Sequence, residues 1–197
     1  MFRNPVRELP PGWAETRRVV LTEDQLLLRL NLWSLVPLAI SAIAMLIWAF
    51  IVSSTHATAP AGPDIPWWLA IILSLLVLPL HELVHAILIL GVGHRPRMGM
   101  KLDKGVLYAT ADNALFTRNQ YLAVALSPFI VISVAGAASL LVLPSGWWWT
   151  VALAVILNAG GAIGDLWVSA QVIQAPATAL VRDTEDGFVL YMREVAD

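Results

Sequence analysis

The sequence contains no cysteine, which excludes disulfide bonds, thiolate metal ligands and cysteine nucleophiles. It is also poor in charge, because only 13% of its 197 residues are Asp, Glu, Lys or Arg, about half the fraction that is usual in a soluble domain. The formal net charge of −2 gives no electrostatic reason to expect nucleic acid as a partner. Hydrophobic residues make up 58% of the chain, and this composition indicates a membrane protein.

Four long apolar stretches predict the fold class. A helix needs about 20 apolar residues to cross a lipid bilayer, and this condition is met by residues 31–53, 66–93, 120–143 and 147–173. We therefore expect an all-α membrane protein with four transmembrane helices. Outside them, residues 98–110 and 179–192 each hold two short β-type runs around a turn that contains glycine. These two segments predict short cytoplasmic β-hairpins.

The basic residues predict the orientation of the chain. All twelve Lys and Arg lie in the N-terminal segment 1–30, in the loop 94–119 or in the tail 174–197. The positive-inside rule then places both termini in the cytoplasm. Within the N-terminal segment, Thr22 is a suitable N-cap for a short amphipathic helix. The expected organisation is this cytoplasmic segment, a four-span membrane domain over 31–173, and a cytoplasmic tail.

The second apolar stretch contains His81, Glu82 and His85, in the spacing His-Glu-x-x-His. Ionisable side chains are costly inside hydrocarbon, and residues four apart lie on one face of a helix. In zinc peptidases this spacing supplies two metal ligands and a general base that acts on water. The spacing predicts that both histidines bind Zn²⁺ and that Glu82 is the base. The alternative is a structural role, in which these side chains hydrogen-bond to neighbouring helices.

A catalytic zinc site normally has a third protein ligand. Asp165 is the only acidic residue in the fourth apolar stretch, and the first and third stretches have none. At 1.5 Å per residue its depth from the outer surface is about 27 Å, close to about 28 Å for His85. By elimination, Asp165 is the predicted third ligand. The core of this catalytic unit would then span residues 66–173.

Other residues of the third and fourth stretches have two interpretations each. Asn158 lies two turns before Asp165 and could either bind the substrate or its oxyanion, or join two helices. The glycines at 160, 161 and 164 predict a close approach of helices, with local unwinding around Asp165 as the alternative. Pro128 predicts a kink in the third stretch, which could open a path to the site or only shape the bundle.

The motif HELVH at 81–85, an intervening span, and then Asn158 and Asp165 resemble the core of the site-2 proteases, which are intramembrane zinc metalloproteases. The resemblance implies zinc on His81, His85 and Asp165, Glu82 as the base and Asn158 in contact with the substrate. It covers roughly residues 66–173.

Two positions depart from the site-2 protease pattern. Gly161 stands where that family has proline, and Leu166 stands where it has glycine after the aspartate. The stretches HELVHA, FTRNQYLAVALSP and RDTEDGF look even more like a group of small bacterial membrane proteins known as "putative zincin peptidases".

The predicted function is an intramembrane zinc metalloprotease in a bacterial or archaeal cell membrane. Its expected partners are the lipid bilayer and a membrane protein or peptide, which it would cleave in or near a transmembrane segment. One alternative is a non-catalytic zinc-binding membrane protein that binds transmembrane helices. Another is a transporter or proton relay that uses the same ionisable residues, although four spans without an inverted repeat disfavour it. The pattern predicts no particular oligomeric state.

Overall fold

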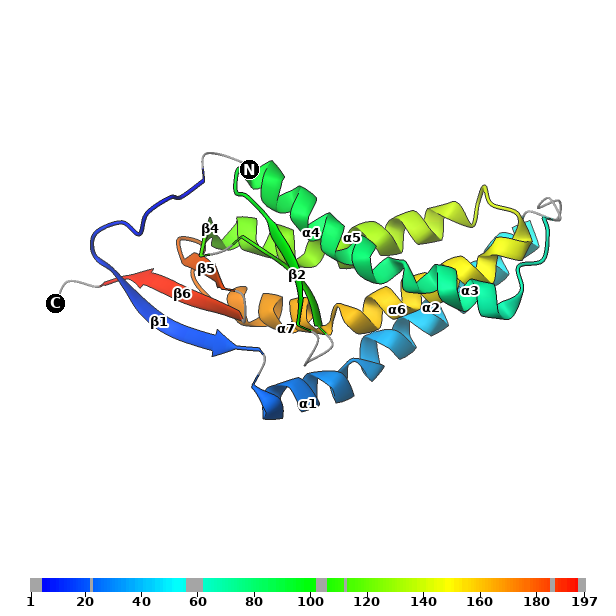
Figure 1. Ribbon diagram of the computed structural model, residues 1–197, viewed down its shortest axis with the longest axis horizontal. Helices are drawn as coiled ribbons and strands as arrows, with labels where there is room; N and C mark the ends of the chain where they lie inside the picture. The colour runs from blue at the N-terminus through cyan, green and yellow to red at the C-terminus, as the bar shows by residue number, and fades with distance from the viewer. Residues whose placement is uncertain are drawn as a thin grey trace. The chain divides into compact units, whose positions relative to one another are not determined.

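The computed structural model describes residues 5–21, 23–55, 62–101, 106–111, 113–184 and 187–194. In chain order its elements are β1 (Trp13–Val20), α1 (Asp24–Trp33), α2 (Leu35–Thr55), α3 (Trp67–Leu75), α4 (Val77–Val92), β2 (Arg97–Lys101), β3 (Val106–Thr110), β4 (Leu115–Thr117), α5 (Arg118–Ser139), the 3-10 helix η1 (Ser145–Trp147), α6 (Trp148–Gly161), α7 (Ile163–Val172), β5 (Leu180–Thr184) and β6 (Gly187–Arg193) (Figure 1). They form two compact units. Unit 1 contains the described parts of Met1–Arg29, Glu82–Ser127 and Gly164–Asp197, and unit 2 contains those of Leu30–His81 and Pro128–Ile163.

Unit 1 is built on a four-stranded antiparallel sheet in the order β1-β6-β5-β4. Strands β5 and β6 form a hairpin, and β1 comes from the other end of the chain to pair with β6, with Trp13 opposite Arg193. Figure 1 shows β1 and β6 side by side. A second, two-stranded sheet consists of β2 and β3. The prediction of an all-α protein is therefore wrong, although both segments expected to form hairpins do pair.

Strand β1 escaped prediction for a physical reason. Its sequence, WAETRRVV, has a central run of exposed residues and lacks the alternation of apolar and polar residues that marks a half-buried strand. Charged side chains are common on edge strands, where they oppose pairing with other chains. The helix expected near Thr22 is present as α1, whereas Thr22 itself lies outside the described residues.

The core of unit 1 joins the sheet to three helices. Phe116, Val181 and Phe188 are at most 1% exposed. They belong to one apolar cluster that also contains Ile89 of α4, Val124 of α5 and Val168 of α7. Ile89 lies one turn after His85, and Val168 lies three residues after Asp165. The core therefore holds the two helical turns that carry these polar side chains.

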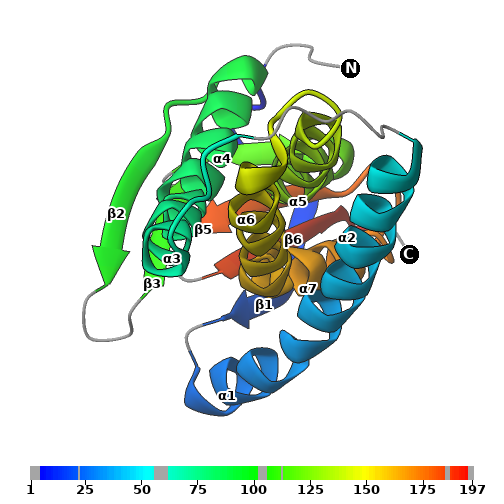
Figure 2. The same ribbon diagram turned by 90° about the vertical axis from the view of Figure 1, so that its right-hand side faces the viewer.

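Unit 2 contains α2, α3, η1 and α6, together with the end of α1, the start of α4 and the second half of α5. Figure 2 shows α2 and α6 running alongside one another. The Trp48 indole N–H donates to the Ala137 carbonyl at 2.8 Å, and the Ser74 hydroxyl donates to the Thr150 carbonyl at 2.9 Å. A Cβ atom on Gly136 would overlap the side chain of Val155, so a glycine is needed where α5 approaches α6. Small residues and such polar contacts are typical of helix packing in membranes.

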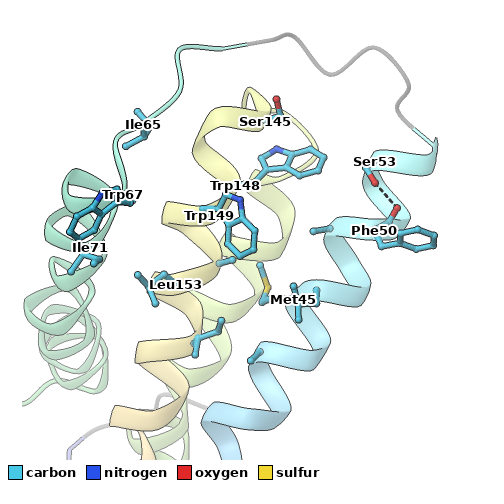
Figure 3. Close-up of a pocket in the computed structure, with 16 residues that line it drawn as sticks. Met45, Phe50, Ser53, Ile65, Trp67, Ile71, Ser145, Trp148, Trp149 and Leu153 are labelled. Atoms are coloured by element: carbon cyan, nitrogen blue, oxygen red, sulfur yellow. Dashed lines mark hydrogen bonds between the residues drawn. The ribbon is translucent and has the colours of Figure 1, made fainter.

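Unit 2 contains an apolar pocket. It has a volume of about 830 Å³ and is lined by residues of α2, α3 and α6 and the turns next to them. Figure 3 shows the indoles of Trp67, Trp148 and Trp149 around it. None of the described residues that line it is titratable, and it therefore offers no group for acid–base or metal chemistry.

Three described helical stretches are long and apolar enough to cross a membrane, namely Asp24–Thr55, Trp67–Val92 and Arg118–Ser139. The fourth predicted span is two helices, Ser145–Gly161 and Ile163–Val172, which are bent by 45° and make a fourth span only if counted together. The break follows two glycines, and it places Asp165 in the first turn of α7. Of the three glycines predicted to allow a close approach of helices, only Gly160 does so: a Cβ atom there would lie 3.3 Å from Leu38, and none would meet a neighbour within 4 Å at Gly161 or Gly164.

Candidate metal centre

His81 and His85 lie on one uninterrupted helix, α4, which runs from Val77 to Val92. The two histidines are one helical turn apart, and therefore their side chains share a face of the helix. Both are buried, with exposed fractions of 8% and 7%. Helix α4 thus presents two imidazoles in a largely water-free environment.

The ring of His85 is held by a carbonyl group that a proline makes available. The Nδ1–H of His85 donates to the backbone oxygen of Val124 at 3.0 Å, which also accepts the Ser127 hydroxyl at 2.7 Å. Within α5 the N–H of residue 128 would normally bond this carbonyl, but Pro128 has no N–H. Because Nδ1 carries the proton, the lone pair of His85 is on Nε2.

The lone pair of His85 faces a carboxylate. Its Nε2 lies 3.3 Å from Oδ2 of Asp165, so that two acceptors face each other unless a cation lies between them. A proton on the imidazole would serve, and so would a metal ion. Two ligands of a tetrahedral zinc ion are about 3.4 Å apart when each is roughly 2.1 Å from the metal. The observed distance therefore fits two ligands of one ion.

His81 is oriented in the same way by Asn158. The Nδ1–H of His81 donates to Oδ1 of Asn158 at 2.9 Å, and the Asn158 amide donates to the Pro128 carbonyl at 3.3 Å. Asn158 is only 1% exposed. The structure thus places it against His81 and α5, and its predicted contact with substrate stays a prediction.

The three predicted ligands come together. One ligand atom from each of His81, His85 and Asp165 lies within 4.8 Å of the other two, and the turn of α4 that joins the histidines carries His81 to the same place as His85. Two neutral imidazoles and one carboxylate are a donor set of catalytic zinc sites, which keep a position open for water or substrate. Each ring also donates its second N–H to an oxygen acceptor, as zinc-bound histidines usually do. These residues therefore fit zinc.

Glu82 lies three residues before His85 on α4, where side chains are neighbours on the helix surface. It is partly exposed and is not one of the three residues whose ligand atoms cluster. Its carboxylate is thus adjacent to the metal ligands without being counted among them. A general base must lie within hydrogen-bond reach of the water, and the role of Glu82 as that base stays a prediction.

A small cavity adjoins the ligands within unit 1. It has a volume of about 70 Å³, and its lining includes His85, Asp165, Tyr121 and Asp183. It shares no lining residue with the large apolar pocket. Tyr121 and Asp183 were not predicted from the sequence, because nothing in a single strand or helix indicates that their side chains meet this cavity.

Asp183 is fixed by two short hydrogen bonds. Its Oδ2 accepts the Thr110 hydroxyl and the Ala111 backbone N–H, both at 2.7 Å. Burial raises the pKa of the Asp183 carboxyl, and these two hydrogen bonds act in the opposite direction. The C-terminal hairpin, which lies far from the His-Glu-x-x-His motif in sequence, therefore contributes a carboxyl group to the cavity.

The sequence profile of a family described as "Putative zincin peptidase" matches residues 74–180, more than half of the chain. The matched region includes both histidines of α4 and Asp165, and it ends before Asp183. No curated protein and no solved structure matches the chain.

Proposed function

This chain belongs to the family of putative zincin peptidases, and from that premise we propose that it is a membrane-embedded zinc peptidase that cleaves peptide bonds in or near transmembrane segments. Membership of the family implies zinc and metallopeptidase activity. The observation that carries the proposal is the meeting of His81, His85 and Asp165, with the second nitrogen of each imidazole bonded to an oxygen.

In the proposed hydrolysis, the zinc ion and the side chains of the protein have different roles. Zinc bound there would supply a Lewis acid for the scissile carbonyl and for water. Glu82 accepts a proton from water as the water oxygen attacks the carbonyl carbon, and it gives that proton to the nitrogen as the C–N bond breaks. Asn158 and the Val124 carbonyl keep each imidazole in one tautomer, in which Nδ1 carries the proton and Nε2 carries the lone pair that would bind the ion.

The exposed surface of the helices supports a location in the bilayer. On α2 the side chains of Ile40, Leu46 and Phe50 are between 58% and 72% exposed. Soluble monomers rarely expose large contiguous apolar patches, whereas lipid tails would cover them. Helix α4, which carries both histidines, likewise exposes the apolar side chains of Leu83, Ile87 and Leu90. We therefore propose a membrane protein or peptide as the substrate.

Replacing Glu82 tests the mechanism. The zinc-loaded protein in liposomes is mixed with a detergent extract of bacterial membrane proteins, and new N-termini are identified by mass spectrometry. We expect Glu82→Gln to abolish new termini while its zinc content stays at the wild-type value. Glu23→Gln, an exposed position in front of α1, is the matched control and should leave the termini unchanged.

Two outcomes would contradict the proposal. If Glu82→Gln produced the same termini as the wild type, Glu82 would not be the base. If the wild-type protein held zinc but produced no termini, the alternative of a non-catalytic zinc-binding membrane protein would be favoured.

A further inference from the structure

We propose that Asp183 binds a primary ammonium group of the substrate inside the cavity beside the metal ligands. The proposal rests on the proposed peptidase function and specifies one chemical feature of what the enzyme accepts. The ammonium group is either the free N-terminus of a substrate or the amine that cleavage releases.

The sheet determines that Asp183, and not its neighbour, meets the cavity. Successive residues of a strand point to opposite faces. The guanidinium of Arg182 lies over the ring of Tyr191, 5.2 Å from its centroid, while Asp183 lines the cavity together with His85 and Asp165. The alternation of side chains along β5 therefore separates this carboxylate from the adjacent basic residue, Arg182.

The carboxylate of Asp183 has one oxygen engaged and one available. Both of its side-chain hydrogen bonds, from Thr110 and Ala111, end on Oδ2. Oδ1 has no hydrogen-bond partner, and no Lys or Arg forms an ion pair with Asp183, among the residues that the structure describes. Removing a carboxylate from water is costly unless a cation accompanies it. An ammonium group would supply both the missing cation and a donor for Oδ1.

The balance of charge favours a cation as the ligand. A zinc ion held by the two histidines and Asp165 would have its two positive charges balanced by Asp165 and Glu82. In that state both imidazoles are neutral, and an ionised Asp183 would add a further negative charge to the site. The cavity of about 70 Å³ has room for an ammonium group or a few water molecules, and not for a large side chain.

A pair of small zinc-binding probes tests the proposal. Glycine hydroxamate and propionohydroxamate have the same size and differ in one group, an ammonium or a methyl. Calorimetry with the zinc-loaded wild-type protein should show that glycine hydroxamate binds at least about tenfold more tightly, which is the effect of one charge-assisted hydrogen bond. In Asp183→Asn, which keeps an acceptor for Thr110, this preference should disappear while zinc stays bound.

Thr110→Val is the matched control, because it removes one hydrogen bond of Asp183 and keeps the charge, and it should retain the preference. Equal affinity of the two probes for the wild-type protein would overturn the ammonium site and leave the peptidase proposal intact. No binding of either probe would overturn the zinc site and the ammonium site together. Loss of zinc from Asp183→Asn would show that Asp183 acts on the metal instead. The comparison of the two probes on the wild-type protein does not depend on whether any variant folds.

The two sources of the amine can be separated with a synthetic peptide that spans one of the cleavage sites identified from the new termini. Acetylating its N-terminus should lower its turnover if Asp183 binds the substrate's N-terminus. Turnover should stay unchanged if Asp183 binds the released amine, and added glycine amide should then inhibit the wild-type protein more strongly than Asp183→Asn. If acetylation and glycine amide both act equally on the wild type and Asp183→Asn, Asp183 binds neither amine.

Discussion

Nε2 of His85 lies 3.3 Å from Oδ2 of Asp165, although the two residues are 80 positions apart in the sequence. The Nδ1–H of His85 is already donated to the Val124 carbonyl, and with a neutral imidazole the short distance therefore joins two acceptors. The contact needs a cation. Zinc provides one in a peptidase of this family, and the following predictions test how the chain holds it.

Removing the carboxylate of Asp165 should remove zinc. Loss of a group that only orients a ligand costs about 10–100-fold in metal affinity, and we expect Asp165→Ala to cost more than that because a ligand itself is lost. Zinc affinity is measured by competition with a chromophoric chelator. Asp64→Asn, at an exposed position in unit 2, is the control. Unchanged affinity in Asp165→Ala would exclude Asp165 as a ligand.

Asn158 should act through His81. Asn158→Ala removes the acceptor of the His81 Nδ1–H, and we expect zinc affinity to fall by about 10–100-fold. Asn158→Asp keeps an oxygen at that position and should keep most of the affinity. If Asn158 contacts substrate instead, Asn158→Ala will bind zinc as the wild type does and will raise KM. Chelator competition and steady-state kinetics on both variants separate the two roles.

Pro128 should matter for zinc because of the N–H that it lacks. In Pro128→Ala the new N–H can bond the Val124 carbonyl and compete with His85. We expect a several-fold loss of zinc affinity with little loss of helix content by circular dichroism. Pro37→Ala, in the first turn of α2, is the matched control. Equal zinc affinity in the two variants would mean that the Val124 carbonyl serves both donors.

His94 should make the fold less stable in acid. Its ring N–H donates to the Leu115 carbonyl at 3.1 Å, and its ring packs edge-on against Phe116. Burial lowers the pKa of His94 below its usual 6.5. The folded state therefore binds fewer protons than the unfolded state in this range, and stability is lost as the pH falls below about 6.5 through the folded-state pKa.

The measurement for His94 is the Tm in detergent with a metal chelator present, between pH 8 and pH 5. We expect the Tm of the wild-type protein to fall more in this range than that of His94→Gln, whose amide can still donate to Leu115 without titrating. Parallel curves for the two proteins would show that His94 does not contribute to the acid sensitivity.

Much of the candidate site could be predicted because its rules are local. His81, Glu82 and His85 belong to one helix, where spacing alone decides which side chains share a face. Asp165 could be found by elimination, since few acidic residues occur in apolar stretches. The groups that orient these ligands were harder to find. A proline four residues after Val124 was the available signal for its free carbonyl, and Asn158 remained open between two roles.

The sequence by itself determined the apolar helices, the types of ligand and their order along the chain, because composition and helical periodicity are properties of neighbouring residues. Only the tertiary structure decided that β1 joins β6, that the fourth apolar stretch breaks between α6 and α7, and that Asp183 enters the cavity beside His85 and Asp165. The physical reason is that strand pairing and burial depend on contacts between residues far apart in the chain. Such contacts produce no periodic pattern of apolar residues in the sequence. A charged edge strand, or an aspartate that lines a cavity, therefore cannot be distinguished there from solvent-exposed residues.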